Sequence, residues 1–112
     1  GLTLDIGHAI GAQLNTGEPV VVPDDDWAGW DAVKSVHLSG QQVLTTGRGR
    51  VWMDAHGSEF SVQQLHYAAQ VLQRGRAVRA LTLEMEGASR EVVRRNFAHV
   101  RALMQEVDIC AS

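Results

Sequence analysis

The 112-residue chain repeats one pattern about four times: a short apolar or β-branched run, a polar turn, and a longer stretch with helical periodicity. Dividing 112 residues by four gives about 28 per repeat, which is enough for one strand and one helix. Strands that alternate with helices are typical of parallel sheets, because the helix carries the chain back to the edge where the next strand begins. The pattern therefore predicts an α/β fold built from parallel βα repeats.

Four segments are expected to form the parallel strands: Leu2–Asp5, Ser35–Ser39, Arg50–Asp54 and Val78–Glu84. Residues 40–50 contain too many glycines for a confident helix prediction. Val20–Val22 is flanked by two prolines, so we expect an extended connection there.

Helices are expected at His8–Leu14, over about ten residues from Asp24, from Ser61 to Gly75, and from Ser89 onward. Ser61 and Gln64 have the spacing of a capping box, and Ser89 is the expected N-cap residue of the last helix. Apolar residues spaced by three and four predict a buried stripe along that helix, made of Val93, Phe97, Val100, Met104 and Val107.

Every predicted strand carries a carboxylate or an imidazole near its C-terminal end. These residues are Asp5 and His8, His37, Asp54 and His56, and Glu84. The C-terminal ends of parallel strands lie at one edge of the sheet, where such folds build their catalytic sites. Asp54 and His56 are two residues apart, so on a continued strand they would face the same side and reach a common ion. Three carboxylates and three imidazoles suit iron, manganese or zinc.

Some of these residues also have an ordinary structural interpretation. Asp5 can cap the helix that follows it, and His37, between two apolar residues, can be a core histidine. The acidic run Asp24–Asp26 can begin a helix or bind a metal ion. A helix start is favoured, because the positive end of the helix dipole attracts carboxylates. Glu84 is harder to explain in this way, because carboxylates are seldom buried without a partner. Ligand-type residues in all four repeats favour a shared metal site.

Composition argues against several classes of protein. The net charge of −3 offers no basic surface for nucleic acid. No apolar run approaches the ~20 residues that span a bilayer. The one cysteine, Cys110, rules out an internal disulfide framework and fits a reducing compartment. We therefore expect a single cytoplasmic domain over residues 1–112.

The ordered motifs Asp5-x-x-His8, His37, Asp54-x-His56 and Glu84 resemble the second half of the metal site in xylose-isomerase-like TIM barrels, the superfamily that includes endonuclease IV. Within that superfamily, the segments LDIGHA, SVHLSG, MDAHG and LTLEMEG, followed by REVVRRNFAHVRAL, are similar to the multinuclear non-haem iron-dependent oxidative enzymes (the MNIO family), which are related to the methanobactin-synthesis oxidase. The resemblance covers nearly the whole chain. It implies that the chain corresponds to the C-terminal half, about four βα units, of an eight-unit TIM barrel.

The resemblance also implies a function. Members of the family use iron and dioxygen to modify a ribosomally made peptide, often at a cysteine, and a small partner protein presents that peptide. The ligands of two or three iron ions, with zinc or manganese as alternatives, would be Asp5, His8, His37, Asp54, His56 and Glu84.

The chain departs from the family in two ways. Gln41 and Gln42 stand where the family often has a further histidine. The N-terminal half of the barrel, with the ligands it would supply, is not in the sequence. Half a barrel would expose two sheet edges and an apolar inner face, so we expect the missing half of a longer protein, or a second copy, to complete it. The isolated chain is then expected to be inactive.

Two other functions stay open. One is a sugar isomerase or an endonuclease-type phosphodiesterase of the same superfamily, using zinc, manganese or magnesium. The other is a non-catalytic half-barrel that acts as an interaction module and binds no stoichiometric metal. The sequence does not identify the substrate or the reaction.

Overall fold

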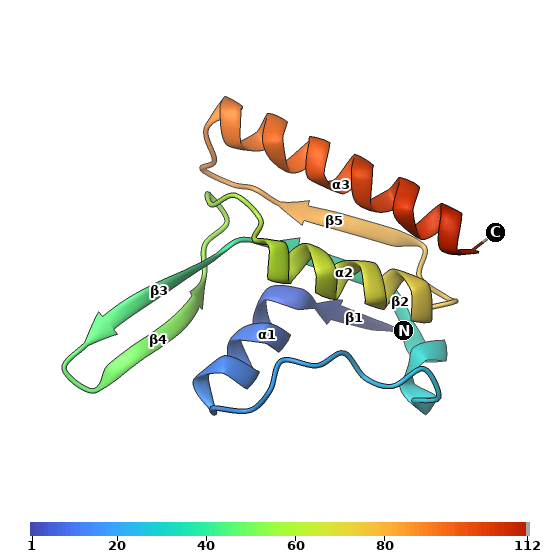
Figure 1. Ribbon diagram of the computed structural model, residues 1–112, viewed down its shortest axis with the longest axis horizontal. Helices are drawn as coiled ribbons and strands as arrows, with labels where there is room; N and C mark the ends of the chain where they lie inside the picture. Colours follow the sequence, from blue (N-terminus) through green and yellow to red (C-terminus); the bar gives the residue numbers. More distant parts are fainter. Residues whose placement is uncertain (112) are drawn as a thin grey trace.

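A three-stranded parallel sheet organises the computed structural model, which describes residues 1–111 and the side chains of residues 1–107. The sheet has the order β1 (Leu2–Asp5), β2 (Val33–Ser39), β5 (Ala80–Glu84), as Figure 1 shows. The predicted α/β class with a parallel sheet is confirmed. The side chain of Cys110 lies outside the described residues.

The expected third parallel strand is wrong. Its residues form β4 (Gly49–Asp54), which pairs antiparallel with β3 (Gln41–Thr46) in a separate two-stranded sheet. The turn end of this hairpin extends beyond the parallel sheet (Figure 1). Only two residues separate the paired Thr46 and Gly49, and Gly49 has a φ of 116°, which an L side chain rarely adopts. A tight turn between the two strands therefore forms locally, in place of a crossover to the parallel sheet.

Three α-helices follow the strands: α1 (Ile6–Asn15), α2 (Val62–Arg74) and α3 (Arg90–Ala111). The predicted capping box of α2 is confirmed. The Ser61 hydroxyl accepts a hydrogen bond from the backbone N–H of Gln64, and the Gln64 side-chain oxygen accepts one from the backbone N–H of Ser61. The Ser89 hydroxyl accepts a hydrogen bond of 3.1 Å from the backbone N–H of Val92 at the start of α3, as expected.

The ten-residue helix expected from Asp24 is a 3₁₀ helix of five residues, Ala28–Ala32. The spacing of three between Trp27 and Trp30 matches a 3₁₀ turn, and β2 begins immediately afterwards at Val33. The Trp30 indole is buried and donates a 2.8 Å hydrogen bond to the Asp24 carbonyl oxygen. The segment Val20–Val22 lies outside the helices and strands, as expected for a connection.

The two faces of the parallel sheet differ in polarity. Val36 and Leu38 of β2 are fully buried in the hydrophobic core. The opposite face carries Thr3 and Asp5 from β1, Ser35, His37 and Ser39 from β2, and Ala80, Thr82 and Glu84 from β5. This face is polar, so the expectation of an apolar inner face is wrong, and its exposure needs no apolar cover.

The predicted apolar stripe of α3 is partly wrong. Val100 and Val107 are buried as expected, but Phe97 is 51% exposed. Met104, at 39%, also faces out. The helix is rotated because the amide of Asn96, which is fully buried, bonds to the segment before α2: its oxygen accepts a 2.9 Å hydrogen bond from the Phe60 backbone N–H.

Glu59 joins that segment to α3 through two side-chain hydrogen bonds. Its carboxylate accepts 2.9 Å and 2.7 Å hydrogen bonds from His99 and Arg95. These hydrogen bonds hold the pKa of Glu59 below its ordinary value of 4.5. Because the pKa is lower in the folded chain, ionised Glu59 stabilises the fold above its unfolded pKa, and this contribution is lost as the pH falls through the folded value.

We predict that Glu59→Gln flattens the acid limb of the stability profile. The free energy of unfolding of the wild type should fall more than that of the variant between about pH 5 and about pH 3, because only the wild type protonates this carboxylate. Urea denaturation followed by circular dichroism measures both profiles. Parallel profiles for the two proteins would contradict the role given to Glu59.

Candidate metal centre

The carboxyl ends of β1, β2 and β5 meet at one edge of the parallel sheet, and the end of β4 lies beside them. The strand register places Asp5 opposite His37 and Ser39 opposite Glu84. The backbone N–H of Ala55, directly after β4, donates a 2.9 Å hydrogen bond to the Gly40 carbonyl, directly after β2. The hairpin therefore returns Asp54 to the same edge as the parallel strands.

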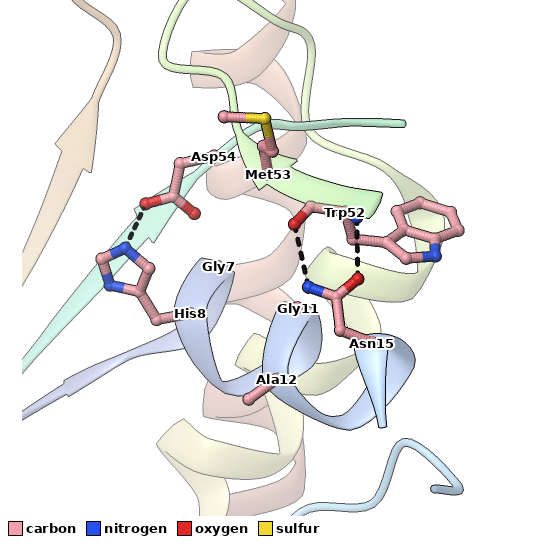
Figure 2. Close-up of a pocket in the computed structure, with 8 residues that line it drawn as sticks. All are labelled: Gly7, His8, Gly11, Ala12, Asn15, Trp52, Met53 and Asp54. Carbon is pink, nitrogen blue, oxygen red and sulfur yellow. Dashed lines mark hydrogen bonds and ion pairs between the residues drawn. The ribbon is translucent and has the colours of Figure 1, made fainter. Parts of the chain in front are cut away.

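The first group of potential ligands is Asp5, His8 and Asp54. Asp5 caps α1, since its Oδ1 accepts a 3.0 Å hydrogen bond from the His8 backbone N–H, and its Oδ2 lies 3.1 Å from His8 Nδ1. The other ring nitrogen, Nε2, lies 2.7 Å from Asp54 Oδ2 (Figure 2). A neutral imidazole carries only one N–H, so only a protonated ring can donate to both carboxylates.

The second group is Asp5, His37 and Glu84, one residue from each parallel strand. His37 Nδ1 lies 3.5 Å from Glu84 Oε1. His37 is half-buried on the polar face of the sheet, so it is not a core histidine.

The third group is His56, Glu84 and Glu86. His56 Nε2 lies 3.7 Å from Glu84 Oε2, and its Nδ1 lies 2.7 Å from Glu86 Oε2. A hydrogen bond from its own backbone and one from His56 hold the pKa of Glu86 below its ordinary value. Glu86 is therefore an ionised carboxylate aimed at the imidazole.

The three groups are linked by two shared carboxylates. Asp5 belongs to the first and second groups, and Glu84 belongs to the second and third. Within each group, one ligand atom of each residue lies within 4.8 Å of the others. Because a carboxylate has two oxygens, Asp5 and Glu84 can each bind two neighbouring ions.

A further observation indicates that the three ligand groups suit a bound cation. Glu84 Oε1 is buried and has no hydrogen-bond partner among the described residues, its contact with His37 Nδ1 being long at 3.5 Å, and burial of a poorly satisfied carboxylate oxygen is costly. A metal ion would satisfy this oxygen. Mixed imidazole and carboxylate ligands suit iron, manganese or zinc.

All six residues singled out in the sequence lie at this edge, but one expected pairing is different. Asp54 and His56 belong to different groups, so the expectation of a common ion for them is not supported. His56 follows β4 in a turn, where the alternation of side chains along a strand no longer holds. Sequence reasoning missed Glu86. The spacing Glu84-x-Glu86 after a strand was the available signal.

Small residues and side-chain amides bring α1 close to the hairpin. Gln41, at one of the two positions where a further histidine was considered, donates a 2.9 Å hydrogen bond from Nε2 to the Gly7 carbonyl. The Asn15 amide bonds both backbone groups of Trp52, at 2.8 and 3.1 Å (Figure 2). These contacts fix the distance between His8 on α1 and Asp54 on β4.

A pocket of about 350 Å³ opens beside the first group. Its lining residues include Gly7, His8 and Asn15 of α1 and Trp52, Met53 and Asp54 of β4, as Figure 2 shows. Asn15 already bonds Trp52, so His8 and Asp54 supply the polar chemistry of the pocket.

No family model, curated protein or solved structure matches the chain. The assignment to the MNIO family therefore stays a prediction that rests on the motifs. Among the described residues, no helix has the length and apolar character needed to cross a membrane.

We predict opposite effects of alanine at two glycines of α1. A Cβ at Gly7 would lie 2.5 Å from Ser39 Oγ and 2.7 Å from Asp54 Oδ1, whereas a Cβ at Gly11 would meet no heavy atom closer than 3.7 Å. Gly7→Ala should destabilise the fold by about 1–3 kcal/mol through overpacking. Gly11→Ala should be neutral or stabilise by up to about 1 kcal/mol, because alanine is the better helix former.

Urea denaturation of the two variants and the wild type measures these changes in the free energy of unfolding. If Gly7→Ala were as stable as Gly11→Ala, the close contact among α1, Ser39 and Asp54 would not exist in solution.

Proposed function

We propose that the chain holds two or three iron ions and forms part of an oxidative enzyme of the MNIO type that modifies a ribosomally made peptide. The observation that carries the proposal is the continuity of the three ligand groups through Asp5 and Glu84. Isolated acidic residues are common on protein surfaces, but a row of groups that share carboxylates is suited to several ions side by side. The motif resemblance adds iron and the peptide substrate to this proposal.

The chemistry follows from the ligand set. Iron held by these ligands would reduce dioxygen. His8, His37 and His56 would provide the nitrogen ligands, and the carboxylates would balance the charge of the ions. The pocket between α1 and β4 is placed to receive a substrate side chain next to His8 and Asp54. A small partner protein would present the peptide.

The proposal includes the half-barrel architecture. The parallel strands β1, β2 and β5 are the elements that would belong to the barrel, and β1 and β5 are the two edges that a complementary half or a second copy would extend. The ligands that such a partner contributes would complete the coordination of the ions.

We predict a graded loss of metal from variants of the third group. Glu84→Gln should remove the ions of two groups, because Glu84 is shared, while His56→Ala should remove only one. Matched controls are Glu106→Gln and His66→Ala, which change exposed residues of α3 and α2 outside the three groups. Native mass spectrometry of protein purified anaerobically with iron gives both the iron content and the number of subunits.

Retention of all iron by both Glu84→Gln and His56→Ala would contradict the site assignment. Oxygen uptake separates the candidate functions. Iron-dependent uptake that Glu84→Gln abolishes supports an oxidative enzyme. Metal binding without uptake in the assembled protein favours an isomerase or a phosphodiesterase, and the lack of any stoichiometric metal favours an interaction module.

A further inference from the structure

Two buried oxygen atoms at the metal centre have no hydrogen-bond partner among the described residues: Oγ of Ser39 and Oε1 of Glu84. The two residues are register neighbours on β2 and β5, and Ser39 is 0% exposed. A hydroxyl can donate one hydrogen bond, and a carboxylate oxygen can only accept. Each atom is therefore a suitable partner for the other.

The backbone of Ser39 is fixed by its surroundings. Its carbonyl oxygen accepts a 2.6 Å hydrogen bond from Nε2 of Gln64, a fully buried side chain of α2. Gly7 lies close to the Ser39 side chain, since a Cβ there would lie 2.5 Å from Ser39 Oγ. Rotation of the side chain is the remaining freedom of Ser39.

Glu84, by contrast, is held weakly. Its Oε1 lies 3.5 Å from His37 Nδ1 and its Oε2 lies 3.7 Å from His56 Nε2, both long for a charge-assisted hydrogen bond. The carboxylate is therefore able to turn when a cation replaces these contacts.

We propose that Ser39 is a positioning residue of the metal centre, whose hydroxyl donates a hydrogen bond to Glu84 Oε1 through the lone pair that a bound metal ion leaves free. Hydrogen bonds of this kind orient ligating carboxylates and commonly change metal affinity by about 10- to 100-fold. An unpartnered buried hydroxyl lowers the stability of the metal-free protein. When an ion is bound, the hydroxyl has Glu84 as its hydrogen-bond acceptor. The inference rests on the proposed function, because it needs metal bound by Glu84.

Ser39→Ala tests the inference, with Ser35→Ala as the matched control. Ser35 lies four residues earlier on the same strand and face, and its hydroxyl already has a partner, Thr3 Oγ1 at 2.7 Å. Ser39→Ala should weaken Fe(II) binding by about tenfold or more while the metal-free protein keeps or gains stability. Ser35→Ala should lose some stability and keep its Fe(II) affinity.

Anaerobic titration calorimetry with Fe(II) and urea denaturation of the metal-free proteins give the two readouts. If Ser39→Ala binds Fe(II) as tightly as the wild type, or if its metal-free form is less stable than that of Ser35→Ala, the positioning role is wrong and the proposed function stands. If the wild type binds no Fe(II), both the proposed function and this inference are overturned.

Discussion

Backbone hydrogen bonds between β2 and its two parallel neighbours place Asp5 opposite His37 and Ser39 opposite Glu84. A shift of one residue in either pairing would turn these side chains to the opposite face of the sheet, among the leucines and valines of the core. The burial of Val36 and Leu38 on that face therefore fixes the register, and through it the site. The same packing that stabilises the sheet also aligns the candidate ligands.

The site concentrates negative charge at the end of the sheet. The imidazoles of His8, His37 and His56 lie among four carboxylates there. These carboxylates belong to Asp5, Asp54, Glu84 and Glu86. Such an arrangement is costly without a cation, because like charges repel and Glu84 Oε1 lacks a hydrogen bond among the described residues. A site of this kind is better explained by binding than by stability. The close approach of α1 through Gly7 adds to this view, since a Cβ there would lie 2.7 Å from Asp54 Oδ1.

Much of this arrangement was predictable from the sequence, because it depends on local patterns. Strands β1, β2 and β5 and the capped helices α2 and α3 follow from hydrophobic periodicity and from Ser61 and Ser89. The expected parallel strand at residues 50–54 failed, because periodicity does not tell which partner a strand finds, and the turn before Gly49 offers a nearer one. The face of α3 was misjudged at Phe97, because a buried amide at Asn96 outweighed the apolar spacing.

The candidate site was predictable as a set of residues but not as a set of contacts. Strand ends identify Asp5, His37 and Glu84, because parallel strands finish at one edge. Which residues share an ion depends on the hairpin and on the turn at His56, and neither is encoded in ligand spacing alone. Glu86 was missed for the same reason, because it is an exposed residue that becomes a ligand candidate only when His56 turns toward it.

Anomalous X-ray diffraction at the iron absorption edge, from crystals grown anaerobically with Fe(II), tests the central claim most directly, because it locates each ion. The account predicts separate anomalous peaks beside the three ligand groups, with Asp5 and Glu84 each between two of them. A map with no peak at these carboxylates, or with iron bound only elsewhere on the surface, would contradict it.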